Sequence, residues 1–312
     1  MTDPMTTGPA KVSIIIPTQR RPGPLALALG SVLAQTGVDA DTLEIVIVDN
    51  DQTPSARAAI QATAAASATV IRYVHEPRAG VAHARNTAVA ASTGAFIAFL
   101  DDDEEAPPTW LSDLLAVQAR FDADVVFGPV NARLPAAITR HRAYLTRFFS
   151  RPGPAGAQVL DTYYGCGNSL LRRASLPNRS EPFDLSRNHI GGEDDLLFGT
   201  MQAAGARFAW APAAWVHEDP APNRLTLAYT LRRAFAYGQG PTSHCAAHSD
   251  RLGMARWMAI GLGQAAVFGL WGVVRWIARA PDVAETWDRA ARGLGKTFWG
   301  GPMKIQFYGT SA

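Results

Sequence analysis

Short β-branched segments alternate with alanine-rich segments through the first 130 residues, and this alternation restricts the fold more than any other feature of the sequence. Segments of strand composition cover residues 12–17, 43–48, 70–75, 96–100 and 124–127, and segments of helical composition cover residues 24–35, 55–66, 81–91 and 108–120. Strands that alternate with helices are typical of a parallel sheet covered by helices. The sequence therefore predicts an α/β fold with a mostly parallel sheet.

The loops that follow the predicted strands are candidate ligand contacts, because open sheets of this kind bind ligands beyond the carboxyl ends of their strands. Asp49 could accept hydrogen bonds from a base or a ribose, and a solvated turn is the alternative. Arg78 and Arg85 could contact phosphate or a base, and surface ion pairs are the alternative. Pro17 ends the first predicted strand, Thr18 and Arg20 follow it, and all three would face the same edge.

Five acidic residues follow the fourth predicted strand, in the segment Phe96-Ile-Ala-Phe-Leu-Asp-Asp-Asp-Glu-Glu. Because side chains alternate along a strand, we expect Asp101 and Asp103 to point the same way and Asp102 the opposite way. Carboxylate oxygens are the ligands that Mg²⁺ and Mn²⁺ prefer, so this pair is a candidate site for either cation. An acidic loop or a helix N-terminus ahead of Pro107 and Pro108 is the alternative.

Four segments, in this order and spacing, resemble glycosyltransferase family 2: Val12-Ser-Ile-Ile-Ile-Pro-Thr, Ile45-Val-Ile-Val-Asp-Asn-Asp, Ala84-Arg-Asn-Thr-Ala and Phe99-Leu-Asp-Asp-Asp. The resemblance implies the GT-A fold, a Rossmann-like sheet flanked by helices, and transfer of a hexose-type sugar from a nucleoside-diphosphate donor, for which a UDP-sugar is expected. It implies that Asp49 binds the base, that Asp101 lies near the ribose and that Asp103 ligates Mn²⁺ or Mg²⁺. The residues predicted to bind the donor nucleotide are Pro17, Thr18, Arg20, Asp49, Arg78, Arg85, Asp101 and Asp102.

The resemblance also suggests how the chain is divided. We expect residues 11–128 to form a nucleotide-sugar-binding subdomain and residues 129–222 an acceptor-binding subdomain. Residues 223–312 are helical, basic and aromatic in composition and are expected to form a C-terminal helical extension. Residues 1–10 are polar and are expected to be a disordered tail.

The segment Gly191-Gly-Glu-Asp-Asp-Leu-Leu-Phe resembles the Glu-Asp motif that provides the catalytic base of the family, and Asp194 is the predicted base. In a single in-line displacement, this carboxylate would take the proton of the acceptor hydroxyl while the cation stabilises the departing diphosphate, and the anomeric carbon would invert. The usual motif has Glu-Asp, then a spacer residue, then another Asp. Here Asp195 stands at the spacer and Leu196 at the later acidic position, so Asp195 stays an alternative base. A helix N-terminus with three acidic residues is the structural alternative.

Further positions are candidates for contacts with the sugars or the metal. The segment Gly165-Cys-Gly-Asn-Ser resembles the small-residue segment of the family, so Gly167 and Asn168, together with Glu193 and Asp195, are predicted to line the acceptor or sugar site. His217 follows an apolar run, at a position where related enzymes often place a metal or phosphate contact. The alternatives are that Gly167 and Asn168 only form a turn, and that His217 has a structural role.

The segment from Trp257 to Val274 contains 18 residues without charge, which is the lower limit for crossing ~30 Å of hydrocarbon. Gly261, Ala265 and Gly269 are four residues apart, a spacing that lets helices approach closely in lipid. Three readings stay open: a spanning helix, an interfacial or re-entrant helix, and a buried or homodimer-forming helix.

Charge and cysteine content exclude several classes of protein. The net charge is only +2, from 29 basic and 27 acidic side chains, so no nucleic-acid partner is expected. Cys166 and Cys245 lie far apart, which argues against a disulfide framework and a zinc site. The N-terminal segment lacks the features of a signal peptide, so we expect a cytoplasmic enzyme, with its extension peripheral to or anchored at the cytoplasmic face of the inner membrane.

Other nucleotide-binding classes lack their signatures here. An NAD-dependent oxidoreductase or a P-loop hydrolase would need a glycine-rich turn after the first strand, where this chain has Pro17-Thr-Gln-Arg-Arg. The chain is therefore predicted to be an enzyme that adds one sugar per encounter to a saccharide or lipid-linked acceptor. The alternative is a catalytically silent nucleotide-sugar-binding or scaffold subunit of a polysaccharide assembly system.

Overall fold

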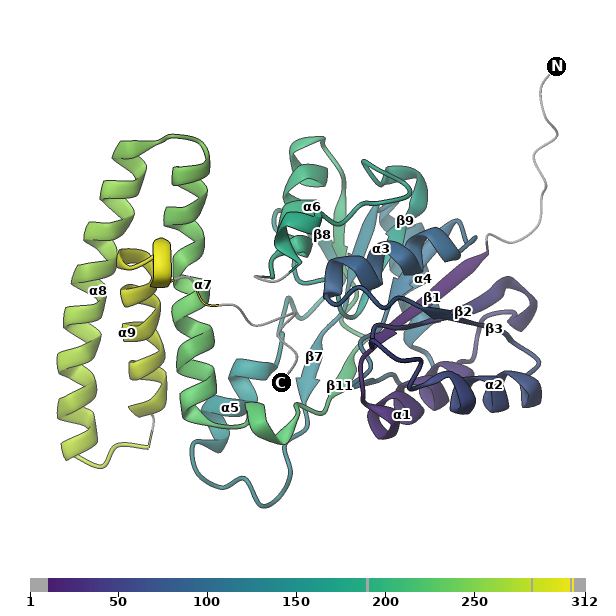
Figure 1. Ribbon diagram of the computed structural model, residues 1–312, viewed down its shortest axis with the longest axis horizontal. Helices are drawn as coiled ribbons and strands as arrows, with labels where there is room; N and C mark the ends of the chain where they lie inside the picture. The colour runs from purple at the N-terminus through teal and green to yellow at the C-terminus, as the bar shows by residue number, and fades with distance from the viewer. Residues whose placement is uncertain (1–10, 189–190, 282, 304, 306–312) are drawn as a thin grey trace. The chain divides into compact units, whose positions relative to one another are not determined.

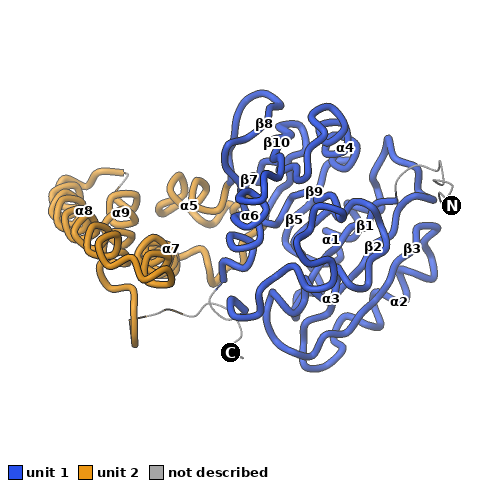
Figure 2. The backbone as a smooth tube through the Cα atoms, turned by 90° about the horizontal axis from the view of Figure 1, so that it is seen from above, with its two compact units in different colours: residues 1–131, 151–218, 307–312 blue, residues 132–150, 219–306 orange. Residues whose placement is uncertain are grey.

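The computed structural model describes residues 11–188, 191–281, 283–303 and 305. The chain divides into two compact units, coloured separately in Figure 2: residues 1–131, 151–218 and 307–312 form the first, and residues 132–150 and 219–306 form the second. The tail expected at residues 1–10 lies outside the described residues.

An eight-stranded sheet of order β3-β2-β1-β4-β9-β6-β10-β8 forms the centre of the first unit (Figure 1). Five of its strands are those predicted from the sequence: β1 (Val12–Thr18), β2 (Leu43–Asp49), β3 (Val70–His75), β4 (Phe96–Phe99) and β6 (Val125–Phe127). The first four pair with one another in parallel. The prediction of an α/β fold with a mostly parallel sheet is therefore confirmed.

Helices cover both faces of the sheet because strand side chains alternate between two separate cores. Ile14 and Ile16 of β1 belong to one core, to which α1 (Pro22–Leu33), α2 (Arg57–Ala66) and α4 (Trp110–Phe121) contribute. Ile15 belongs to the other, with α3 (Val81–Ala91) and α6 (Glu193–Ala203). A helix that follows a buried strand thus packs back onto the sheet.

Residues 128–220, whose sequence shows little periodicity, contribute short strands that the sequence did not predict: β7 (Val130–Ala132), β8 (Gln158–Leu160), β9 (Ser169–Arg172), β10 (Phe208–Trp210) and β11 (Val216–Glu218). Together with β5 (Glu104–Glu105), β11 and β7 form a second sheet. β9 runs antiparallel to β4, with Ser169 opposite Phe99. The residues before Ser169 therefore lie beside the acidic residues after Phe99.

The second unit consists of α5 (Arg142–Phe149), α7 (Leu227–Ala247), α8 (Arg251–Ile277) and α9 (Val283–Thr297). The predicted C-terminal helical extension is thus confirmed. Its small core contains Leu134, Tyr144, Leu145, Leu225 and Ala284. The unit also includes residues 132–150, which the sequence analysis assigned to the acceptor-binding subdomain.

Candidate active site

The carboxyl ends of β1, β2, β3 and β4 meet at one edge of the sheet, because these strands are parallel and in register. Thr18 lies opposite Asp49, and Asp49 lies opposite His75. The Thr18 hydroxyl donates a hydrogen bond to Asp102 Oδ2 over 2.7 Å, which joins the end of β1 to the turn after β4. The polar loops predicted to converge do so.

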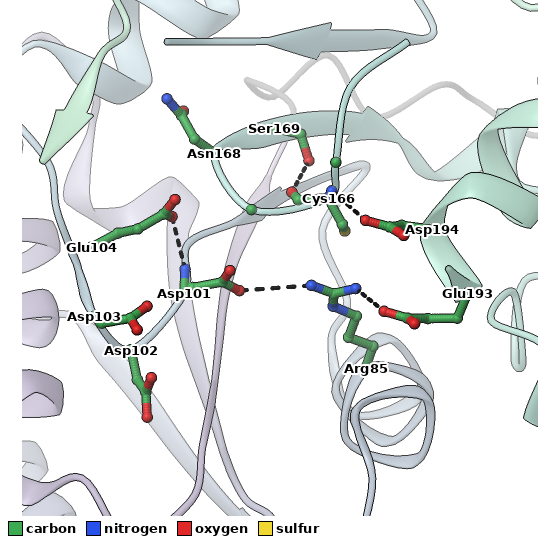
Figure 3. A network of polar contacts seen from close by, with 12 residues as sticks. Arg85, Asp101, Asp102, Asp103, Glu104, Cys166, Asn168, Ser169, Glu193 and Asp194 are labelled. Carbon is green, nitrogen blue, oxygen red and sulfur yellow. Dashed lines mark hydrogen bonds and ion pairs between the residues drawn. The ribbon is translucent and has the colours of Figure 1, made fainter. Parts of the chain in front are cut away.

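The acidic residues after β4 form a turn and do not continue the strand. β4 ends at Phe99, and the Glu104 N–H donates a hydrogen bond to the Asp101 carbonyl oxygen over 3.0 Å. The alternation expected for Asp101, Asp102 and Asp103 is therefore wrong. Arg21 Nη1 lies 2.9 Å from Asp102 Oδ1 and 2.7 Å from Asp103 Oδ2, whereas Asp101 faces Arg85 (Figure 3).

Two carboxyl groups of this turn are buried, and burial changes their chemistry. Burial raises the pKa of Asp102 to about 6, although the Arg21 guanidinium opposes the shift. Burial and the neighbouring Asp101 carboxylate raise the pKa of Glu104 well above its ordinary value. Arg21 and Glu104 stand in loops that the sequence analysis singled out, but neither was predicted as a site residue because nothing in the pattern distinguishes them from their neighbours.

Arg85 connects the acidic turn after β4 with the first turn of α6. Its side chain is buried, and Nη1 donates a hydrogen bond to Glu193 Oε1 over 2.5 Å. Its Nη2 lies 3.7 Å from Asp101 Oδ1. The guanidinium is therefore a charge bridge between Asp101, near the start of the acidic turn, and Glu193, in the first turn of α6 (Figure 3).

The segment from Gly165 to Asn168 lies between Asp194 and Asp101. The Cys166 N–H donates a hydrogen bond to Asp194 Oδ2 over 3.1 Å. A Cβ atom added at Gly165 would lie 3.3 Å from Asp194 Oδ2, and one added at Gly167 would lie 2.6 Å from Asp101 Oδ2. The predicted base and the predicted donor-side carboxylate thus contact the same short segment.

Arg151 holds this segment in place, and the sequence analysis did not predict it. Its half-buried side chain donates hydrogen bonds to the carbonyl oxygens of Gly165, Gly167 and Asn168 over 2.7, 2.5 and 3.1 Å, and to that of Gly128 over 3.0 Å. Burial lowers its pKa, while Glu104 and Asp101 oppose the shift. An arginine that stands just before the Pro- and Gly-rich residues 152–156 carries no sequence signal of this role.

The predicted base and its alternative differ in their surroundings. Asp194 is partly buried and faces Cys166, whereas Asp195 is exposed on the next position of α6. Gly192, which precedes the helix, has φ 82°, a conformation that favours glycine, so the helix begins with Glu193, Asp194 and Asp195 in its first turn. This start directs Glu193 to Arg85 and Asp194 to the Gly165–Asn168 segment.

Other predicted donor-binding residues have protein partners. Asp49 is fully buried and accepts hydrogen bonds from the Tyr73 hydroxyl over 2.9 Å and from the Ala56 N–H over 2.8 Å. Arg78 pairs with Glu76 and Arg20 with Asp51 at the surface. Pro17 is half-buried within β1. Their roles toward a nucleotide stay predictions.

Asn168 and His217 lie in different settings. The Asn168 side chain is fully buried, accepts a hydrogen bond from Trp110 Nε1 over 2.7 Å and points away from the acidic residues (Figure 3). Its Nδ2 donates to two backbone carbonyls. His217 lies on β11 opposite Glu105, with its ring packed on Trp215. In this arrangement Asn168 stabilises the loop through its side chain.

The acidic turn offers a divalent cation oxygen ligands only, which suits Mg²⁺ or Mn²⁺. Within the described ranges, no group of three or more His, Cys, Asp or Glu side chains is arranged to hold a metal ion. Asp101 and Asp103 could contribute two carboxylates, and donor phosphates and water would have to complete the coordination. A cation there would compete with Arg21 for Asp103. The metal stays a prediction.

Comparisons of the sequence with known proteins point to one family. The family model described as "Glycosyl transferase family 2" matches residues 13–179. The chain is 38% identical over 229 residues to the succinoglycan biosynthesis protein ExoM of Rhizobium meliloti, covering 73% of each. It is 31% identical over 107 residues to the Escherichia coli protein named UDP-Glc:alpha-D-GlcNAc-diphosphoundecaprenol beta-1,3-glucosyltransferase WfgD, covering 34% of this chain and 39% of WfgD.

A solved structure supports the fold. The crystal structure of residues 1–349 of TarS from S. aureus superposes with a TM-score of 0.51 at 18% sequence identity, covering 73% of this chain and 65% of TarS. A likeness at this identity concerns the fold alone. The family model covers more than half of the sequence, and it includes the acidic turn and the Gly165–Asn168 segment. The chain belongs to glycosyl transferase family 2.

Proposed function

We propose that the protein transfers a hexose-type sugar from a nucleoside-diphosphate donor to a saccharide or lipid-linked acceptor, one sugar per encounter, with inversion at the anomeric carbon. The observation that carries this proposal is the common contact of Asp194 and Asp101 with the Gly165–Asn168 segment. Because the predicted base and the predicted donor-side carboxylate contact the same loop, we propose that donor and acceptor sugars meet beside it.

Asp194 would act as the general base. One of its oxygens accepts a hydrogen bond from the Cys166 N–H, which fixes the carboxylate while it takes the proton of an acceptor hydroxyl. Arg85 would hold Glu193 and Asp101 in place by its charge. Cys166 would take no part as a nucleophile, because burial raises the pKa of its thiol well above the ordinary value.

The donor would lie over the edge formed by Thr18, Asp49 and the acidic turn. Mg²⁺ or Mn²⁺, held by Asp101 and Asp103, would offset the charge of the diphosphate when bound. Arg21 already supplies one positive charge at Asp102 and Asp103. This guanidinium would remain beside the donor phosphates if a cation displaced it from Asp103.

The relatives suggest the kind of donor and acceptor. ExoM is named a succinoglycan biosynthesis protein, and the name of WfgD gives a UDP-glucose donor and a diphosphoundecaprenol-linked acceptor. We therefore propose a UDP-sugar donor, a polysaccharide or its lipid-linked precursor as acceptor, and a place at the cytoplasmic side of the membrane. We also propose, as the sequence leads us to expect, that residues 11–128 bind the donor and residues 129–222 bind the acceptor.

A binding screen followed by turnover tests it. UDP, GDP, dTDP and CMP, each with and without Mn²⁺, are compared for the rise in melting temperature that ligand binding produces. Hydrolysis of the sugar donor that carries the best nucleotide is then measured for the wild type, Asp194→Asn, Asp103→Ala and, as the matched control, Asp195→Asn. We expect activity in the wild type and Asp195→Asn, and loss in the other two with unchanged melting temperatures.

Two outcomes would contradict the proposal. Equal turnover in the wild type and Asp194→Asn would show that Asp194 is not the general base. Nucleotide binding without turnover in any variant would favour a catalytically silent nucleotide-sugar-binding or scaffold subunit.

A further inference from the structure

Helix α8 exposes large apolar side chains along much of its length. Leu252, Leu270 and Ile277 are 82%, 72% and 70% exposed, and the intervals between them, 18 and 7 residues, correspond to five turns and about two turns. These side chains therefore lie on one side of the helix. Only 11% of the most apolar 18-residue window of α8 is buried, so the core of the second unit does not account for its apolar character.

The opposite side of α8 is small and polar, and it faces the unit itself. Gly261 packs against Gly293, and Gly272 packs against the Trp287 ring, both of α9. Gln264 donates a hydrogen bond to the Arg289 carbonyl and accepts one from Lys296 Nζ, each over 2.7 Å. A helix on a water-soluble unit normally has the reverse arrangement, with apolar side chains inward and polar ones outward.

The packing of α9 argues that α8 does not cross a membrane. α9 lies beside α8 (Figure 1), at Gly261 and again at Gly272, so the two helices share about three turns of contact. The α9 residues beside that stretch, between Trp287 and Gly293, include Asp288, Arg289 and Arg292. If α8 spanned the hydrocarbon, these charges would enter it as well, which is costly. An orientation in the plane of the membrane leaves them on the water side.

Charge identifies the kind of surface that the second unit fits. The sequence segments of this unit contain 15 basic and five acidic side chains, a net charge of +10, whereas the remaining 14 basic and 22 acidic side chains give the first unit −8. Arg251, Arg256 and Arg279, near the two ends of α8, are exposed. A basic unit with an apolar helix side complements the surface of an anionic bilayer.

We propose that α8 lies in the plane of an anionic lipid bilayer, with the side marked by Leu252, Leu270 and Ile277 inserted among the acyl chains. The exposed arginines at its ends contact lipid phosphates, and α9 faces the water. This inference deepens the membrane location given under the proposed function, but none of the residues proposed for catalysis takes part in it.

Vesicle flotation of the full-length protein tests the surface. We expect binding to phosphatidylcholine vesicles that contain phosphatidylglycerol, and weaker binding at high salt or without the anionic lipid. Leu252→Glu with Leu270→Glu should lower the ratio of bound to free protein by about tenfold or more. The matched control is Leu27→Glu with Val159→Glu, at exposed apolar positions of the first unit, and it should bind as the wild type does.

Arg251→Gln, Arg256→Gln and Arg279→Gln, combined, should remove most of the enhancement by phosphatidylglycerol and leave binding to neutral vesicles unchanged. Equal binding of the wild type and the double glutamate variant would overturn the proposal. A soluble dimer that ignores vesicles and dissociates in that variant would also overturn it, because a second copy would then cover α8. Asp194→Asn should float as the wild type does, so a failure of the catalytic proposal would be recognised separately.

Orientation is measured with spin labels on Leu252→Cys, Leu270→Cys and Ile277→Cys. Equal, shallow depths at the three positions are expected for a helix in the membrane plane. A depth that is greatest at position 270 and small at 252 and 277 would indicate a spanning helix and would contradict the proposal.

Discussion

The Arg85 guanidinium lies among carboxylates that belong to different parts of the sequence. It donates to Glu193 and faces Asp101, and both its own side chain and that of Glu193 are buried. A charged carboxylate stays buried only when a partner offsets its charge. Arg85 therefore stabilises the folded site as well as setting its electrostatics. At the scale of single residues, the site therefore depends on a charge pair that the acidic motifs alone do not reveal.

Replacement of Arg85 by methionine should lower the free energy of unfolding by about 3 to 5 kcal/mol, because Glu193 would be left charged and buried without its partner. Urea denaturation measures the change. Arg147→Met, which breaks the exposed pair with Glu285, is the control and should cost less than about 1 kcal/mol. Glu193→Gln in the Arg85→Met background should restore part of the lost stability. If Arg85→Met and Arg147→Met lost the same free energy of unfolding, the buried pair would contribute no more to stability than the exposed one.

Gly167 is a second position where a single atom matters. A methyl group there would lie 2.6 Å from Asp101 Oδ2 and 3.3 Å from Glu104 Oε1. Gly167→Ala should displace the Asp101 carboxylate and lower kcat/KM for sugar transfer by about 100-fold, as small misplacements in active sites do. Gly156→Ala, where no atom lies within 4 Å of the added group, should leave kcat/KM unchanged. Full activity of Gly167→Ala would show that transfer tolerates a displaced Asp101.

At the scale of elements, the sequence predicts what is periodic or motif-based and misses what is short or long-range. β1 to β4 are β-branched runs bounded by turns, and the Asp101 and Asp194 segments match family motifs, so the sequence indicates both. β9 has only four residues, too few for a period of two to be recognised. Arg151 binds carbonyl oxygens 14 to 23 residues away, which depends on how β9 joins the sheet and therefore on the folded chain.

Glu44 of β2 ties neighbouring elements together and predicts a pH dependence. It accepts hydrogen bonds from Ser13 of β1, Thr93 and Arg72 of β3. Burial opposes ionisation, but these donors outweigh it and lower the pKa of Glu44 from 4.5 to about 2. Because the pKa in the folded state is the lower one, the stabilisation is complete above pH 4.5 and is lost as the pH falls toward 2.

Glu44→Gln should therefore reduce the free energy of unfolding by about 3 kcal/mol at pH 7. The difference from the wild type should shrink between pH 4.5 and 2. Urea denaturation across this range measures it, with Asp113→Asn, whose hydrogen bond with Thr109 lies at the surface, as the control. A difference that stays constant with pH would mean that lost packing, and not ionisation, causes the effect.

At the scale of the whole molecule, the second unit is built from two separate stretches of chain. The Tyr144 hydroxyl of α5 donates a hydrogen bond to Asp288 Oδ2 of α9 over 3.1 Å. Ala284 of α9 packs in the same small core as Leu134 and Leu145. The segment of residues 132–150 therefore depends on α9, which comes more than 100 residues later.

A chain that ends after Asp250 should aggregate, because removal of α9 exposes Tyr144, Leu145 and their apolar neighbours. Light scattering of the purified protein and its yield in the supernatant measure this. Leu252→Glu with Leu270→Glu, which leaves α9 in place, should remain monodisperse and unfold near the melting temperature of the wild type. A truncated protein that is monodisperse, with the wild-type melting temperature, would contradict the interdependence of α5 and α9.

The division of the chain also limits how this protein can recombine with its relatives. Within the described part of the chain, the backbone passes from one unit to the other after residues 131, 150 and 218, so the helical unit is not an appendage that a single junction could transfer. A chimaera that takes only the C-terminal helices from a relative would pair them with a foreign α5. Exchange of the unit requires both stretches together, and natural variation in one should be accompanied by compensating variation in the other.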